Sequence, residues 1–335
     1  MSRPNLFSIA TKELSQDAFL TWLIQWASPD CREFDAGLAA VATEFVKHLI
    51  GLQGEAPAEL TKVTAGRQWK GIDVWAEINS THLVVIEDKV GTGEHSGQLE
   101  RYRRTGEEWC VEHSCTLVCV YIKTQSDSGP NLRRVVEQGY AVLDRRNLLQ
   151  LLDSHEVESD IYNDFRDRLR EIELGESQFT EKPVGTWNEN DWKGLYRALE
   201  TVGVVEKWEL VNNPRGGFWN ALLNWHEAED AYPFMQIEQG NLCFKIGEIY
   251  EDHSGIRSRY HETLLTKGGA ELGLEKPARF GSGAYMTVAL IPRAIWLAEE
   301  NEAPDMPAVI GRLESYKSWF VEVLDLPERN ADMKN

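Results

Sequence analysis

The order of helical and extended segments predicts an α/β protein in which a central mixed β-sheet is flanked by helices. Two observations indicate this fold class. Two segments with helical spacing of apolar residues come first, and residues 60–90 then take on the β-branched and aromatic composition of strands. Further along, CTLVCVYIK (115–123) is an almost continuous apolar run, as expected for a strand buried on both faces.

The first two predicted helices lie before residue 50. The first is expected to be capped by Ser15, and it places Phe19 and Leu23 on one face. Pro29 follows and is expected to end it, because proline cannot continue a helix. The second helix is predicted over about 35–49, where apolar residues recur every three or four positions.

Three strands are predicted next, within VTAGRQWK, GIDVWAEI and THLVVIEDKV. Asn79-Ser80 has the composition of a turn between the last two, so these strands are expected to form a hairpin. The remaining elements of this half are predicted as a helix at 95–109, strands at 115–123 and 140–144, and helices at 145–153 and 158–173.

A domain boundary is predicted in the polar segment 175–186, which contains glycine and proline. Residues 1–175 are expected to form one domain and 187–326 an α+β domain for recognition, sensing or oligomerisation. The second domain is predicted to contain a helix at 189–202, strands in PFMQIEQ, NLCFKIGEIY and AYMTVALIP, and a helix at 308–324.

Two features of the second half have both a functional and a structural interpretation. Its tryptophans could stack on unpaired bases, but core packing is the favoured interpretation. Arg257, Arg259 and His261 alternate and could form a small anion-binding edge, whereas a solvated strand or loop is the simpler interpretation.

The charge balance argues against nonspecific binding of polyanions. The chain has 35 Lys+Arg and 54 Asp+Glu, a net charge of −19, which lowers affinity for nucleic acid. No apolar run approaches the roughly 20 residues of a membrane span, and no signal peptide is recognised, so a cytoplasmic protein without a membrane partner is expected. The 5 cysteines do not indicate a disulfide framework or a zinc site.

Glu87-Asp88-Lys89 follows three apolar residues, Val84, Val85 and Ile86, in a predicted strand. Because side chains alternate along a strand, Glu87 and Lys89 should point to one face and Asp88 to the other. In a hairpin centred on Asn79-Ser80, Asp73 should lie opposite about residues 86–87. Two carboxylates and an ammonium group are therefore expected to meet on one face.

These three residue types suit metal-assisted hydrolysis of phosphodiesters. Carboxylates can hold Mg²⁺, and a nearby lysine can orient the attacking water and offset phosphate charge. An acid-x-Lys triplet alone is a weak signal, since Asp191-x-Lys193 has the same pattern. Only Glu87-x-Lys89 follows an apolar strand with an Asp on the strand before it. The structural alternative is a charged strand end that protects a sheet edge from aggregation.

The chain also resembles the PD-(D/E)xK nuclease superfamily. The matching segments, in the family's order, are ELSQDAFLTWLIQWA (13–27), GRQWKGIDVWAEI (66–78), VVIEDKV (84–90) and GQLERY (97–102). They cover roughly the first third of the chain, and Ile72 stands where the family name has proline. The resemblance implies a restriction-endonuclease-like core that extends to about residue 150.

The resemblance also implies roles for individual residues. Asp73 and Glu87 would be the metal ligands for Mg²⁺, with Mn²⁺ as a substitute, and the backbone carbonyl of Asp88 a third. Lys89 would lie beside the attacking water, and Glu13 would complete the metal site, although a solvated first-turn carboxylate is an equal alternative. Gln98 and Tyr102 lie four residues apart, on one face of a predicted helix. The resemblance implies that they face the site, and the alternative is that they pack against the sheet.

The function expected from the residues and the resemblance is a Mg²⁺-dependent DNA endonuclease with a restriction-like or anti-phage role. A homodimer is expected by the same analogy. Two alternatives stay open. One is a catalytically silent protein that uses a nuclease fold for binding or regulation. The other is an interaction protein whose acidic surface recruits a basic partner, which fits the net charge of −19.

Overall fold

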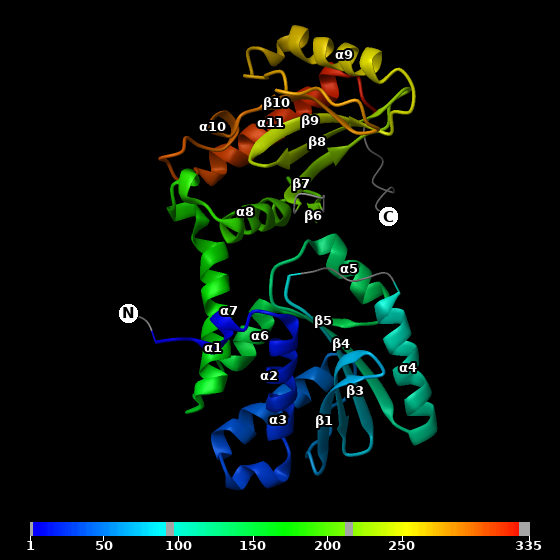
Figure 1. Cartoon of the computed structure of the whole chain (residues 1–335), viewed down its shortest axis with the longest axis vertical. Helices are drawn as coiled ribbons and strands as arrows, with labels where there is room; N and C mark the ends of the chain where they lie inside the picture. The colour runs from blue at the N-terminus through cyan, green and yellow to red at the C-terminus, as the bar shows by residue number, and fades with distance from the viewer. Residues whose placement is uncertain (1–2, 92–96, 212–216, 328–335) are drawn as a thin grey trace. The chain divides into compact units, whose positions relative to one another are not determined.

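The structure is a computed structural model that describes residues 3–91, 97–211 and 217–327. The chain divides into two compact units, Met1–Leu174 and Gly175–Asn335 (Figure 1). The division falls at the start of the polar segment 175–186, within a helix that continues to Ser177. In the described ranges, no helix has the length and apolar character needed to cross a bilayer.

The first unit is built on a five-stranded mixed sheet with the order β1-β2-β3-β4-β5. The first three strands are antiparallel neighbours, while β3, β4 and β5 run parallel. The strands are β1 (Val63–Trp69), β2 (Ile72–Ile78), β3 (His82–Lys89), β4 (Thr116–Lys123) and β5 (Ala141–Asp144). The α/β class and the mixed sheet are as predicted.

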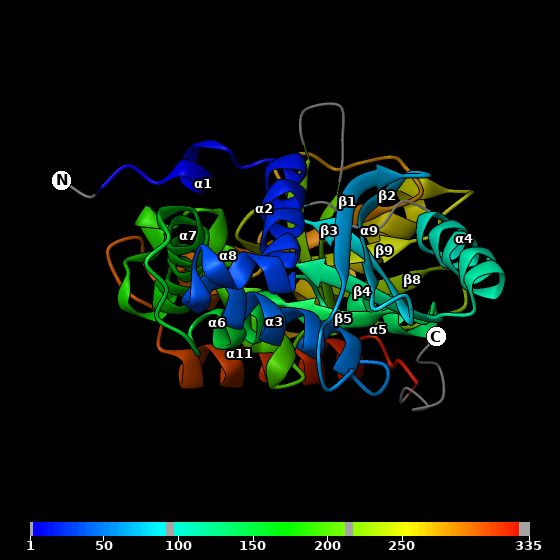
Figure 2. The same cartoon turned by 90° about the horizontal axis from the view of Figure 1, so that it is seen from below.

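Helices cover both faces of this sheet (Figure 2). One face packs with α2, α3, α6 and α7 in a single apolar cluster, and the other packs with α4 in a smaller one. The helices of the unit are α1 (Leu6–Ile9), α2 (Glu13–Trp26), α3 (Ala36–Gly51), α4 (Gln98–His113), α5 (Gly129–Glu137), α6 (Arg145–Leu152) and α7 (Asp160–Ser177). The three-layer arrangement follows from strands that are apolar on both sides.

Two local predictions in this unit have clear outcomes. Asn79 and Ser80 form the predicted turn, with φ angles of 53° and 55°. Two left-handed residues in succession match the twist of a tight hairpin. The predicted cap at Ser15 is wrong, since α2 begins two residues earlier, at Glu13. An acidic residue in the first turn interacts favourably with the helix dipole.

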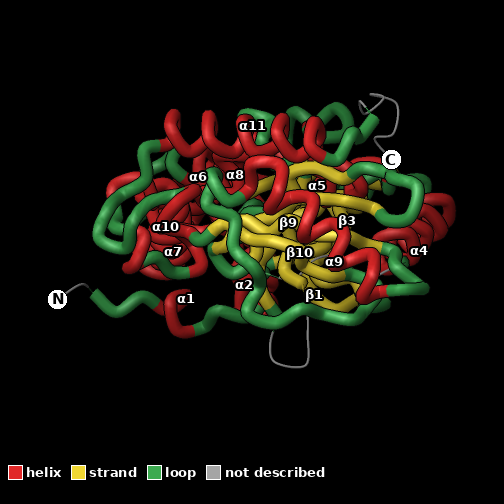
Figure 3. The backbone as a smooth tube through the Cα atoms, turned by 90° about the horizontal axis from the view of Figure 1, so that it is seen from above, coloured by secondary structure: helices red, strands yellow, loops and turns green. Residues whose placement is uncertain are grey.

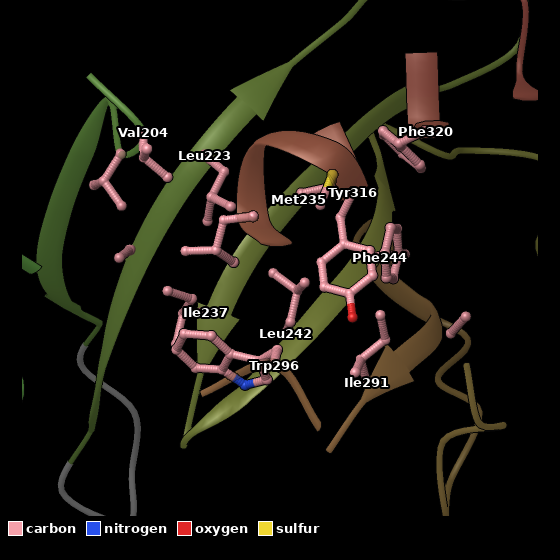
Figure 4. Close-up of a cluster of buried hydrophobic side chains, with 14 of the residues drawn as sticks. Val204, Leu223, Met235, Ile237, Leu242, Phe244, Ile291, Trp296, Tyr316 and Phe320 are labelled. Carbon is pink, nitrogen blue, oxygen red and sulfur yellow. The ribbon is translucent and has the colours of Figure 1, made fainter. Parts of the chain in front are cut away.

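The second unit contains an antiparallel five-stranded sheet with the order β10-β9-β8-β7-β6. Its apolar face packs against α8 and α11, and Figure 4 shows side chains of the sheet meeting Tyr316 and Phe320 of α11. The strands are β6 (Lys207–Val211), β7 (Phe218–Trp225), β8 (Tyr232–Glu238), β9 (Asn241–Gly247) and β10 (Met286–Ile291). The helices are α8 (Glu189–Thr201), α9 (His253–Leu264), α10 (Arg293–Trp296) and α11 (Met306–Val323).

The helix α8, the last three strands and α11 lie where the sequence predicted them. Strands β6 and β7 were not predicted. The segment with Arg257, Arg259 and His261 is neither a strand nor a loop but part of α9 (Figure 3). Its hydrophobic pattern is weak because only Tyr260 and Leu264 of this helix are buried. The core interpretation holds for Trp208, which is 1% exposed.

Candidate functional site

The carboxyl end of β3 places charged side chains at the edge of an apolar sheet. Val84, Val85 and Ile86 are at most 1% exposed, and the strand stays buried through Glu87 at 0% and Lys89 at 4%. Burying ionised groups is costly unless they are paired. Lys89 Nζ lies 2.6 Å from Glu87 Oε1, so the predicted same-face pair is an ion pair in the structure.

The hairpin register brings Asp73 to this pair. Val74 is the partner of Ile86, so the next antiparallel position sets Asp73 opposite Glu87, as predicted from the turn. Asp73 Oδ2 lies 3.8 Å from Lys89 Nζ. The same oxygen accepts a long hydrogen bond of 3.4 Å from the backbone N–H of Asp88. The three residues predicted to meet are therefore neighbours.

A third acid comes from α2. Glu13 Oε2 lies 3.8 Å from Lys89 Nζ, and Glu13 Oε1 accepts a hydrogen bond of 3.3 Å from the backbone N–H of Val90. The carboxylate therefore also helps to hold the backbone just after β3. Of the two interpretations of Glu13, the structure favours a group belonging to this cluster over a solvated carboxylate.

The electrostatics of the cluster depend on burial. Burial and the negative charge of Asp73 raise the pKa of Glu87 to about 8, although Lys89 opposes this shift. Burial lowers the pKa of Lys89, but the hydrogen bond and charge of Glu87, together with Glu13 and Asp73, outweigh it and raise that pKa. The ammonium group therefore stays charged, while Glu87 takes up a proton near neutral pH in the absence of another cation.

The opposite face of β3 holds a second acidic pair that the sequence analysis did not find. Asp88 is 0% exposed and Asp17 on α2 is 2% exposed. Burial and the charge of Asp17 raise the pKa of Asp88 well above its usual range, and burial together with Asp73 raises the pKa of Asp17 to about 6. Burial and mutual repulsion therefore favour the protonated form of this acidic pair. Asp17 could have been noticed because it follows Glu13 by four residues, which places both on one helix face.

Neutral polar groups complete that second pair. Gln16 Nε2 donates a short hydrogen bond to Asp88 Oδ1. The hydroxyl of Thr124, just after β4, in turn donates to Gln16 Oε1 over 2.9 Å. Asp88 therefore anchors α2 and the end of β4 to β3. Its side chain points away from Glu87 and Lys89, so only its backbone carbonyl is available as the predicted third metal ligand.

Gln98 and Tyr102 lie on one face of α4, as predicted. Gln98 Nε2 donates to the Tyr102 hydroxyl over 3.1 Å. Tyr102 is buried in the apolar cluster that also contains Ile72, and its ring lies against Gly71. Within the described ranges, no hydrogen bond or ion pair joins either residue to Asp73, Glu87 or Lys89. The contacts therefore favour the packing interpretation for this pair.

The acids suit a hard cation such as Mg²⁺. Glu87 Oε2 is buried and has no hydrogen-bond donor among the described residues, and a second carboxylate, Asp73, is its neighbour. In the described part of the chain, no group of three or more His, Cys, Asp or Glu side chains is placed so that it could hold a metal ion by itself. Mg²⁺ does not require one, because it retains several waters and is often held by only one or two protein carboxylates. The donor set therefore fits the predicted ion.

A small pocket opens where β3 and β4 end. Its lining includes Lys12, Gln16, Val90 and Thr124. Ligands of α/β proteins often bind at the carboxyl ends of parallel strands. Asp73, Glu87 and Lys89 are not among its lining residues, so this pocket lies beside the acidic cluster and is not part of it.

No protein-family model matches the chain, and comparisons with curated proteins and with solved structures gave no significant match. The similarity to PD-(D/E)xK nucleases consequently depends on the motif residues and their spacing.

Proposed function

We propose that this protein is a metal-dependent nuclease with a restriction-endonuclease-like core in its first unit, acting on DNA as an endonuclease. The observation that carries the proposal is the position of Lys89 Nζ. It lies 2.6 Å from Glu87, 3.8 Å from Asp73 and 3.8 Å from Glu13. These acids come from β3, β2 and α2, so three separate elements converge on one ammonium group.

The residues can divide the work of phosphodiester hydrolysis. Asp73 and Glu87, with the backbone carbonyl of Asp88, would hold Mg²⁺. A bound Mg²⁺ supplies charge stabilisation at the phosphate and lowers the pKa of a coordinated water. Lys89, charged and fixed by its three acids, would orient the attacking water and offset the charge that builds on the phosphate oxygens. Glu13 would hold Lys89 and the end of β3 in place.

The negative net charge of −19 has to be reconciled with a polyanionic substrate. Part of it lies in the cluster itself, where acids are needed to bind a cation. Mg²⁺ at Asp73 and Glu87 would cancel the net negative charge of the cluster of Glu13, Asp73, Glu87 and Lys89. Both substrate binding and catalysis should therefore depend on the divalent ion.

The proposal is tested by nuclease assays on supercoiled, linear and single-stranded DNA and on RNA, with Mg²⁺ or Mn²⁺. We expect the wild-type chain to cleave DNA and the variants Asp73→Ala and Lys89→Ala to lose at least 10³-fold, roughly 4 kcal/mol of transition-state stabilisation. Circular dichroism and thermal unfolding must show that both variants are folded. If both folded variants still cleave DNA, the assignment of Asp73 and Lys89 to a nuclease active site is wrong.

A catalytically silent, nuclease-like binding protein is the second candidate, and one observation favours it. Glu87 and Lys89 are 0% and 4% exposed and already satisfy each other at 2.6 Å. Such a closed pair can serve purely to hold the strand end. Calorimetry with Mn²⁺ distinguishes the two candidates. A nuclease should bind the ion saturably and lose that binding in Asp73→Ala, whereas a silent protein should show no such binding.

A further inference from the structure

A cluster of cations surrounds one aromatic ring in the second unit. The guanidinium of Arg257 lies 4.6 Å from the centre of the Phe280 ring, and Lys276 Nζ lies 4.7 Å from it. The His261 ring meets the same ring edge-on at 5.0 Å. Arg257 and His261 are one turn apart on α9, so the helix presents both to the segment that carries Lys276 and Phe280.

The geometry of this cation–aromatic cluster is held by the backbone. His261 Nδ1 donates to the carbonyl of Val288 in β10 over 2.7 Å, next to which α9 lies (Figure 3). Arg257 Nη1 donates to the carbonyl of Gly281 over 2.6 Å. These bonds tie α9, β10 and the segment after Lys276 together, and they hold the side chains of Arg257 and His261 in place.

The cations of the cluster lack acidic partners. Within the described ranges, neither Arg257 nor Lys276 forms an ion pair, and the buried Nε of Arg257 has no hydrogen-bond acceptor. Arg259, on the same helix, is instead paired with Asp230. The chain has 54 acidic and 35 basic residues, so acidic partners are plentiful. Two cations beside one ring without an acidic partner are therefore not explained by the stability of the fold. Their mutual repulsion would be relieved by an anion.

We propose that this cluster binds phosphates of a nucleic-acid backbone and so docks the substrate at a place separate from the carboxylates of the first unit. The inference rests on the proposed nuclease function for the identity of the anion. The terminal nitrogens of Arg257 donate to the carbonyl of Gly281 and to Ser254 Oγ. Each of them carries a second N–H that can donate to a phosphate oxygen, and Lys276 is exposed and adds a mobile point charge. Cations beside an aromatic ring are also the usual elements of single-strand binding sites.

The test measures DNA binding by the full chain carrying Asp73→Asn, which prevents cleavage during the assay. The double variant Arg257→Gln/Lys276→Gln is compared with the control Arg259→Gln/Lys207→Gln. The control removes the same charge from two cations that pair with Asp230 and Glu209. Fluorescence anisotropy with a single-stranded and a duplex oligonucleotide is recorded from 0.05 to 0.2 M salt, a range over which phosphate contacts dominate the affinity.

We expect the cluster variant to lose about tenfold in affinity and to lower the salt slope by about 1.5, while the control changes both much less. Equal effects of the two variants, or none, would overturn the inference. If polyglutamate displaces the labelled oligonucleotide as effectively as unlabelled DNA does, the inference is also overturned, and the cluster would bind an acidic protein partner instead. If the chain with native Asp73 cleaves DNA and the cluster variant binds normally, only this inference fails. If DNA binds through the cluster and no cleavage occurs, only the proposed function fails.

Discussion

The two faces of the β3 terminus bury acidic groups in different ways. On one face, Glu87 is paired with the ammonium group of Lys89 at 2.6 Å. On the other face, Asp88 meets Asp17 and accepts a hydrogen bond from Gln16, and no Lys, Arg or His among the described residues forms an ion pair with it. Both acids are 0% exposed, so the strand provides the same burial to two adjacent residues. The difference lies in the partner of each buried acid, which is an ammonium group on one face and a second carboxyl group on the other.

This difference indicates which face can do chemistry. A carboxyl group that has an exchangeable proton and a second carboxylate as its neighbour can bind a metal ion in place of that proton. On the other face, the hydrogen bonds from Gln16 to Asp88 and from Thr124 to Gln16 form a structural unit that fixes α2 to the sheet. We therefore expect only mutations on the first face to abolish activity, whereas mutations on either face can alter stability.

The largest expected difference is in cleavage. Glu87→Gln should lose at least about 10³-fold in rate, because it removes a carboxylate that would hold the ion. Asp88→Asn makes the same chemical change one residue later, on the opposite face, and should stay within about tenfold because the backbone carbonyl is kept. The two rates are measured under identical Mg²⁺ concentrations. Equal losses in both variants would abolish the distinction between the faces.

The next largest effect is on stability. Lys89→Met leaves Glu87 buried without its cation and should cost about 3–5 kcal/mol in free energy of unfolding at pH 8, measured with urea. The double variant Glu87→Gln/Lys89→Met should recover most of that loss, since neither charge then remains. A cost below about 1 kcal/mol for the single variant would show that the pair contributes little.

The effect that is smallest per pH unit is a pH dependence of the free energy of unfolding. The pKa of Glu87 rises from 4.5 to about 8 on folding, so the folded chain keeps a proton that the unfolded chain releases in that window. The free energy of unfolding should therefore fall as pH rises from about 4.5 to 8, by up to about 1.4 kcal/mol per pH unit. Glu87→Gln should remove this slope and be relatively more stable at pH 8 than at pH 5.

Asp17→Asn is the matched control for that experiment. The pKa of Asp17 rises from 3.8 to about 6, so this variant should remove only the part of the slope between those values. Denaturant titrations of the metal-free wild type and both variants at four pH values separate the two windows. Identical pH profiles for all three proteins would show that neither carboxyl group retains extra protons in the folded state.

Much of the first unit follows from local sequence. The turn at Asn79-Ser80 determines the register of the hairpin, and the register places Asp73 beside Glu87. Strand alternation separates Glu87 and Lys89 from Asp88. These relations extend over fewer than twenty residues and depend on backbone geometry alone, so they could be predicted without knowing what packs on the sheet.

Other features depend on segments that are distant along the chain. Asp17 contacts Asp88 only because α2 packs on β3, and Arg257, Lys276 and Phe280 meet only because α9 lies against the segment that precedes β10. The helix α9 was not recognised because few of its residues are buried, which leaves no clear apolar period.

For this protein, the sequence alone determined the α/β class, the strand alternation at Glu87-Asp88-Lys89 and the hairpin that brings Asp73 level with them. Only the tertiary structure decided that Glu13 joins this cluster, that Asp88 is paired with Asp17, and that two cations share Phe280. The physical reason is that backbone register propagates along neighbouring residues, whereas the burial and pairing of charges depend on which helices cover the sheet.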